Sequence, residues 1–166
     1  MPSTNAWNHN LPLSRYMNLI TRSYYGALTK QLEHLDVEHY YSILITVEER
    51  QGNPCSQQSL CDQLDVDKAS MVKKIDYLAK KGLVKRSKNP KDRREHRICL
   101  TEKANKIMPE IHQAVNELNS KATQGLNAGQ KKEFYAWLRM VYDNISSQPA
   151  NEVVYKINKI KKPLSK

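Results

Sequence analysis

The stretch DKASMVKKIDYLAKKGLVKRSKNPKDRREHRICL, Asp67–Leu100, decides the fold, because it predicts a helix, a stop and a β-hairpin. Asp67 is a good N-cap, since its carboxylate can accept the free backbone N–H groups of the first turn. Gly82 can adopt the left-handed conformation that ends a helix. Residues 83–86 and 96–100 are strand candidates on either side of Asn and Pro turn residues. One face of the predicted helix is apolar: Met71, Val72, Ile75, Leu78 and Ala79.

Charge within this stretch is strongly one-sided. Residues 67–97 hold twelve Lys or Arg against four Asp or Glu, a net charge of +8, while the whole chain carries +10. A solvated face usually mixes both signs, whereas a basic helix beside a basic loop suits a polyanion such as nucleic acid. Such a helix can enter a major groove, and a hairpin tip can reach the adjacent groove.

Composition limits the class of protein. A chain of 166 residues with 39% hydrophobic content is long enough for one domain with helical extensions. Its mean hydropathy of −0.73 and only five glycines favour exposed helices over an all-β fold. No apolar run is long enough to cross a bilayer, and the N-terminus lacks signal-peptide features, so we expect a cytoplasmic protein. The three cysteines do not form the pattern of a secreted disulfide framework.

Helical periodicity surrounds the central stretch. Residues 11–34 predict a long amphipathic helix, and Asp36 is expected to cap the next one, which ends near Arg50. Ser56 is expected to cap a short helix over 57–63, which together with the Asp67 helix makes a helix-turn-helix. After the hairpin, Thr101 is a predicted N-cap of a long helix.

Two further features mark the C-terminal part. Pro109 lies inside the helix that follows Thr101 and predicts a kink or a restart. Asn127–Gln130 resembles a capping box for a last helix, ended by Pro149. The predicted fold is therefore mainly α with a small β-hairpin wing: a winged helix-turn-helix lobe (36–100), helical flanks (11–34 and 101–147) and a basic tail (150–166), all in one domain (1–166). Long amphipathic flanks need a partner for their apolar stripes, and a two-fold homodimer is the simplest one.

The run from Val37 to about Ile107 resembles the MarR family of winged-helix regulators. The resemblance is carried by QSLCDQL (58–64), DKASMV (67–72), LAKKGLV (78–84), NPKDRR (89–94) and LTEK (100–103). The Asp-Arg-Arg wing followed by the Leu-Thr junction is its most specific part. Ala104 departs from the pattern, since many members have glycine there. The resemblance covers somewhat under half of the chain at the level of motifs.

The resemblance implies a homodimeric regulator, usually a repressor, that binds a pseudo-palindromic DNA operator and is released by a small ligand. It implies that Arg94 enters the minor groove while Asp92 holds the wing loop. The other predicted DNA-binding residues are Lys68, Ser70, Lys73, Lys74 and Tyr77 on the helix, Arg93 on the wing, and Ser56, Gln57 and Gln58 near phosphates. Family members commonly bind small aromatic acids, which suggests Tyr16, Tyr24 and Tyr40 as candidate pocket residues.

Other interpretations stay open. An RNA-binding or protein-binding winged helix could use the same basic face. Cys55, Cys61 and Cys99 suggest redox sensing, with Cys55 near a helix start that would favour a thiolate slightly. Glu38, His39 and His112 suggest a zinc site, but they are few for a closed site, and no metal or cofactor is predicted. We see no nucleophile–base pair or phosphate loop, so we expect no enzymatic activity and no catalytic residues.

Overall fold

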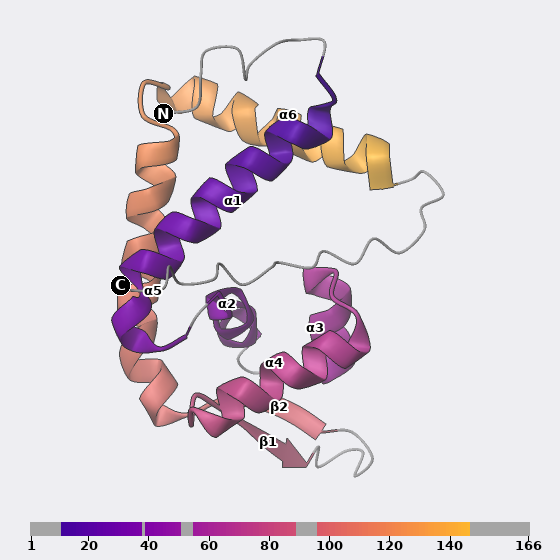
Figure 1. Cartoon of the computed structure of the whole chain (residues 1–166), viewed down its shortest axis with the longest axis vertical. Helices are drawn as coiled ribbons and strands as arrows, with labels where there is room; N and C mark the ends of the chain where they lie inside the picture. The colour runs from indigo at the N-terminus through magenta and orange to yellow at the C-terminus, as the bar shows by residue number, and fades with distance from the viewer. Residues whose placement is uncertain (1–10, 38, 51–54, 89–95, 147–166) are drawn as a thin grey trace, which may run out of the picture. The chain divides into compact units, whose positions relative to one another are not determined.

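The computed structural model describes residues 11–37, 39–50, 55–88 and 96–146 (Figure 1). Its elements in chain order are α1 (Leu13–Gln31), the 3-10 turn η2 (Glu33–Leu35), α2 (Tyr41–Glu49), α3 (Gln57–Leu64), α4 (Lys68–Lys80), β1 (Val84–Lys88), β2 (His96–Leu100), α5 (Glu102–Ala122) and α6 (Ala128–Ser146). They fall into two compact units, residues 1–122 and 123–166, and α6 belongs to the second. The predicted class, mainly helical with one antiparallel hairpin, is confirmed.

The two short helices α3 and α4 begin at the predicted caps. Ser56 Oγ accepts the backbone N–H of Ser59 at 3.1 Å, and Asp67 Oδ1 accepts the backbone N–H of Ser70 at 2.8 Å. Each contact satisfies a donor that the first turn of a helix would otherwise leave without an intrahelical partner. Between them, Asp65 takes a left-handed conformation (φ 49°), which turns the chain sharply from α3 into α4.

The core of the first unit lies beneath α4. Leu60 of α3 and Met71, Ile75 and Leu78 of α4 are fully buried. The other helices of this unit contribute further buried side chains to the same cluster: Leu28, Leu32, Ile43, Leu44, Met108 and Ile111. Removing such side chains from water supplies most of the stabilisation, and it fixes which side of α4 points outward.

The hairpin pairs β1 with β2 in antiparallel register, from Val84 opposite Leu100 to Lys88 opposite His96. Gly82 takes a positive φ of 69° between α4 and β1, as its predicted role requires. A short third segment joins the sheet, since Ser56 and Arg97 form a β-bridge and the Ile98 N–H donates to the Cys55 carbonyl at 2.7 Å. The start of α3 is therefore fastened to the base of the hairpin.

Helix α5 leaves the hairpin through Thr101. The Thr101 Oγ1 accepts the Ala104 N–H at 3.2 Å and donates to the Gly82 carbonyl at 2.6 Å. The hydroxyl therefore caps α5 and ties its start to the end of α4. Farther along, α1 crosses α5 (Figure 1), and the Tyr24 hydroxyl donates to Asn119 Oδ1 at 2.8 Å.

The second unit contains α6, which starts at a reciprocal capping box. The Asn127 N–H donates to Gln130 Oε1, and the Gln130 N–H donates to Asn127 Oδ1, both at 2.9 Å. This prediction is confirmed. The predicted helix end at Pro149 lies outside the described residues, as does the tail. Among the described helices, none combines the length and apolar content needed to span a membrane.

One local prediction is wrong, and one alternative of a second prediction is excluded. Asp36 does not cap α2, because it takes a left-handed conformation (φ 55°) at the end of η2, and α2 begins at Tyr41. Its carboxylate instead contacts Tyr77 of α4. No helix restart occurs at Pro109, since α5 runs unbroken from Glu102 to Ala122. Met108 and Ile111 on either side of the proline are both buried, so core packing holds the two halves in one helix.

Candidate nucleic-acid interface

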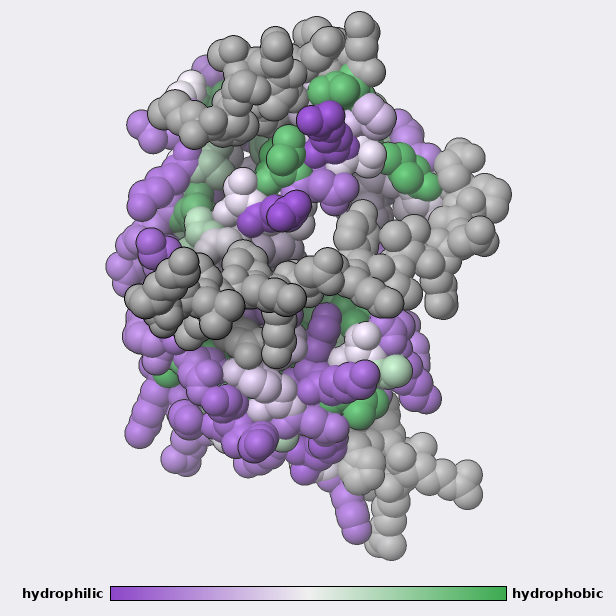
Figure 2. Space-filling model, viewed as in Figure 1, coloured by the Kyte–Doolittle hydropathy of each residue, from purple (hydrophilic) through white to green (hydrophobic). Residues whose placement is uncertain are grey.

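The outward face of α4 is basic. Lys68, Lys73 and Lys80 are exposed, while Ser70 and Lys74 are half-buried on one flank. The buried residues of α4 lie on the opposite side. In Figure 2, the lower part of the face in view, over α4 and β1, is largely hydrophilic. The helix therefore presents lysines to solvent along its length.

Most of these cations have no acidic partner in the part of the chain that the structure describes. Among the described residues, ion pairs form at Lys81, with Asp36, and at Arg86, whose Nη2 lies 2.6 Å from Asp76 Oδ1. No ion pair joins Lys73, Lys74 or any other lysine of this face to a described residue. Cations held on a rigid helix without acidic partners are the arrangement that attracts phosphates.

The N-terminus of α3 lies at the base of the hairpin. Ser56 uses its hydroxyl in the cap, Gln57 is half-buried, and exposed Gln58 donates from Nε2 to Asp62 Oδ1 at 2.8 Å. The first N–H groups of a helix and its dipole favour an anion. Ser56 and Gln57 therefore remain candidates for phosphate contact, while Gln58 already has an intrahelical partner.

The predicted wing residues Asp92, Arg93 and Arg94 lie outside the described residues. The structure does describe the strands that lead to them, β1 up to Lys88 and β2 from His96. Exposed Lys85 lies on β1. The role of the wing tip thus stays a prediction.

Tyr77 makes a contact that the sequence did not predict. It is half-buried, and its hydroxyl donates toward Asp36, 3.2 Å from Oδ1 and 3.3 Å from the carbonyl oxygen. Its ring lies edge-on to Tyr40, with centroids 5.1 Å apart. Tyr77 therefore links α4 to the turn before α2, and these contacts give it a structural role on that side of the helix. No spacing rule pairs residues 36 and 77, which is why sequence reasoning missed this cluster.

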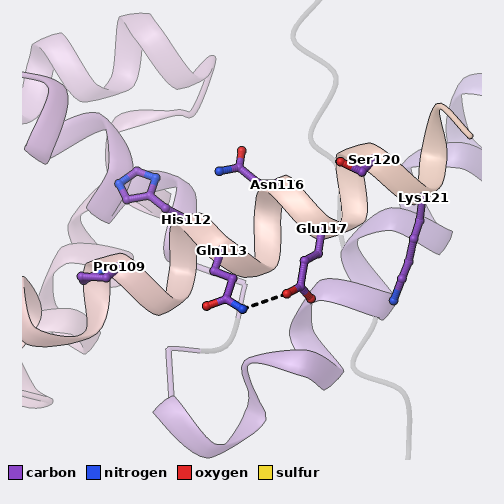
Figure 3. Close-up of a pocket in the computed structure, with 7 residues that line it drawn as sticks. All are labelled: Pro109, His112, Gln113, Asn116, Glu117, Ser120 and Lys121. Atoms are coloured by element: carbon purple, nitrogen blue, oxygen red, sulfur yellow. Dashed lines mark hydrogen bonds between the residues drawn. The ribbon is translucent and has the colours of Figure 1, made fainter. Parts of the chain in front are cut away.

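The three candidate pocket tyrosines lie in different parts of the structure. Tyr24 bonds to Asn119, Tyr40 packs against Tyr77, and Tyr16 lies half-buried near the start of α1. A shallow groove of about 680 Å³ runs along α5. Figure 3 shows the residues that line it: Pro109, His112, Gln113, Asn116, Glu117, Ser120 and Lys121. None of the three tyrosines lines this groove, so a shared tyrosine pocket remains a prediction.

Cys55 and Cys61 do not have the setting of reactive thiols. Cys55 and Cys61 are buried, and burial raises the pKa of both thiols above the ordinary value. The small thiolate-favouring effect expected for Cys55 at a helix start is therefore outweighed by desolvation. Cys99 is partly buried, 3.5 Å from Ser87 Oγ.

The zinc hypothesis has little geometric support. Glu38 lies outside the described residues, and the His39 ring packs at a tilt against Tyr40 with centroids 4.3 Å apart. His112 pairs with Glu48 of α2, Nε2 to Oε2, at 2.5 Å. Within the described part of the chain, no three His, Cys, Asp or Glu residues converge as metal ligands.

Comparison with known proteins adds to this geometry. Residues 39–96 match the MarR family. A curated relative from Thauera aromatica, named "Putative transcriptional regulatory protein for hcr operon", is 32% identical over 101 residues, 60% of this chain and 61% of that protein. The match thus spans less than two thirds of the relative's length.

Solved structures share the architecture. The crystal structure of wild-type MarR from E. coli, in its apo form, is 26% identical, with a TM-score of 0.63 over 81% of this chain and 98% of that one. The crystal structure of an S. aureus MepR–DNA complex is 16% identical, with a TM-score of 0.76 over 83% of this chain and 99% of that one. The second likeness, at low identity, concerns the fold alone.

Proposed function

We propose that this chain, whose residues 39–96 belong to the MarR family, is a sequence-specific DNA-binding transcriptional regulator. The observation that carries the proposal is the outward face of α4 beside the hairpin, where Lys68, Lys73 and Lys80 are exposed and have no ion-pair partner among the described residues. In this proposal α4 is the recognition helix in the major groove. The N-terminus of α3 contacts phosphates, and the wing, with Arg94 at its tip, enters the adjacent minor groove.

The likeness to a curated relative named as a regulatory protein supports the same proposal. An exposed basic surface by itself would suit RNA equally well. A helix of α4's width fits the major groove of B-form DNA but not the deep, narrow major groove of A-form RNA. We therefore favour duplex DNA over an RNA partner.

We further propose a homodimer. Helix α6 exposes large apolar side chains, with Trp137 at 56%, Tyr142 at 66% and Ile145 at 60% exposure. Helix α1 exposes Leu13 at 48% and Ile20 at 52%. Exposed apolar surface of this extent usually marks an interface. Two recognition helices in a two-fold dimer would match the two halves of a pseudo-palindromic operator.

Repression and release by a small aromatic ligand complete the proposal, as the family resemblance suggests. A ligand would lower operator affinity if it bound more tightly to a dimer whose recognition helices are wrongly spaced. The redox-responsive and zinc-responsive alternatives have no observation in their favour, given the buried thiols and the separate pairing of His112.

The test is selection of duplexes from a random DNA library, followed by binding measurements at two salt concentrations. We expect a pseudo-palindromic consensus, a clear preference for that duplex over a shuffled one, and a dimer in sedimentation analysis. Equal affinity for the selected duplex, a shuffled duplex and RNA would contradict the proposal. Binding by a monomer to a single half-site would contradict the dimer alone.

A further inference from the structure

We propose that Asp36 is a positioning residue for the recognition helix, because its carboxylate holds the C-terminal half of α4 against the turn between α1 and α2. The inference rests on the proposed function, since the setting of α4 matters for specificity only if α4 binds DNA. It concerns a residue that contacts α4 from outside the helix-turn-helix and that itself contacts no DNA in this proposal.

Three contacts join Asp36 to α4. The carboxylate forms an ion pair with Lys81 through Oδ2 and accepts the Tyr77 hydroxyl at Oδ1, 3.2 Å away. The Tyr77 hydroxyl also lies 3.3 Å from the Asp36 carbonyl oxygen. The Lys81 Nζ lies 5.5 Å from the centroid of the Tyr77 ring, so the two partners of Asp36 contact each other as well.

Other helices meet the same end of α4. The Tyr40 ring, next to α2, packs edge-on against Tyr77 with an interplanar angle of 71°. From α5, Lys103 Nζ donates to the Lys81 carbonyl at 2.9 Å. Asp36 itself ends the 3-10 turn that follows α1. The C-terminal end of α4 is thus the place where the supports from α1, α2 and α5 converge.

The magnitude of the contact decides what it can do. The Asp36 and Lys81 side chains are 60% and 34% exposed, and ion pairs so exposed add little to the free energy of unfolding. The hydrogen bonds, of which that from Lys81 has the largest effect, lower the pKa of Asp36 and so favour its ionised form. We therefore expect loss of the carboxylate to change the setting of α4 far more than the stability of the fold.

A second consequence concerns charge. Pairing with Asp36 neutralises Lys81, whereas Lys73 and Lys74 have no ion-pair partner among the described residues. Asp36 therefore also restricts which lysines of α4 can attract phosphates. Both effects act on the ratio between specific and non-specific affinity, because non-specific binding depends mainly on phosphate contacts.

The chain offers a closely matched control. Asp36 and Asp65 are the two non-glycine residues of the described chain with positive φ, 55° and 49°. Asparagine tolerates that conformation, so Asp36→Asn and Asp65→Asn make the same change in shape and charge on the same kind of backbone. Of these two carboxylates, only that of Asp36 has an ion pair or side-chain hydrogen bond with a described residue.

The experiment measures affinity for two probes, a duplex selected from random DNA by the unaltered protein and a shuffled duplex of equal length. For Asp36→Asn we expect a loss of about three- to tenfold for the selected duplex. We expect affinity for the shuffled duplex to equal or exceed that of Asp65→Asn, because Lys81 loses its acidic partner, and the thermal unfolding midpoint to match that of Asp65→Asn. The specificity ratio is the affinity for the selected duplex divided by that for the shuffled one. Equal specificity ratios in the two variants would overturn the inference. A parallel fall of both affinities and of the unfolding midpoint in Asp36→Asn would overturn it as well.

A double-mutant cycle tests the route through Lys81. Lys81→Met should lower the specificity ratio as Asp36→Asn does, and the combined variant should lose no more than either single one. Independent, multiplying losses would overturn the route. If the unaltered protein does not distinguish the two duplexes, the proposed function is contradicted. If the unaltered protein distinguishes them and Asp36→Asn does so equally well, only the role of Asp36 is contradicted.

Discussion

Replacing Lys73 should do more than weaken binding. Lys73 is exposed on the outward face of α4 and has no ion-pair partner among the described residues, so its full charge is available. If it contacts a base edge, Lys73→Ala should cost about 1–3 kcal/mol of operator binding and relax sequence preference at one position of each half-site. Lys85, exposed on β1, is expected to contact phosphate only.

The salt dependence separates the two roles. Losing one phosphate contact lowers the slope of log K against log salt by about 0.9, which amounts to about 3.5-fold in affinity between 50 and 200 mM salt. Lys85→Ala should show this change with its sequence preference intact. Lys132→Ala, an exposed lysine of α6, serves as the control that alters neither quantity.

The assay is fluorescence anisotropy at a series of salt concentrations, with the selected duplex and single-base variants of it. Unchanged base preference in Lys73→Ala would refute the placement of α4 in the major groove. If Lys73→Ala and Lys85→Ala both lowered affinity uniformly for every duplex, the division between base reading and phosphate positioning would be wrong.

Three further predictions concern the supports of this site. Thr101→Val removes the hydroxyl that caps α5 and donates to the Gly82 carbonyl at 2.6 Å. It should lower the free energy of unfolding by about 2 kcal/mol in urea denaturation, with Thr101→Ser nearly unaffected; equal loss in both would contradict the hydroxyl's role. Hydrogen bonds from Ser70 hold the pKa of Asp67 below its ordinary 3.8, and the one from the Ser70 side chain has the largest effect. The stability that this carboxylate contributes is therefore present above pH 3.8 and is lost as the pH falls through the lower folded-state pKa. Asp67→Asn should show a weaker acid dependence of unfolding between pH 5 and 3 than the unaltered protein, and an identical dependence would count against the cap. Arg94→Ala should weaken operator binding by about 1–3 kcal/mol while the dimer stays folded, and unchanged affinity would remove the wing from the interface.

The sequence predicted those elements whose signals are local. Ser56, Asp67, Gly82 and Thr101 each sit at a helix boundary, and each makes its contact with residues a few positions away or adopts the expected backbone conformation. The fold class followed from these boundaries and from the helical spacing of apolar residues. The outward position of Lys73 followed in the same way.

What the sequence did not reveal depends on long-range contacts. Asp36 looked like a helix cap, because a cap and a left-handed turn favour the same residue type. Its partners, Tyr77 and Lys81, become apparent only in the folded structure, where the end of α4 packs beside it. Likewise, no local rule pairs Asp76 with Arg86. The burial of Cys55 also depends on packing that helix position alone cannot reveal.

The β-bridge between Ser56 and Arg97 has a consequence for how such a protein could acquire a new target. It joins the residue that precedes α3 to the stem of the hairpin by backbone pairing, so their separation is set by backbone geometry. Adding or deleting a residue between Ser56 and Asp67 would displace α4 relative to Ser56 and the hairpin. Exchange of side chains on α4 leaves the backbone untouched, and variation in preferred half-site sequence should therefore arise there.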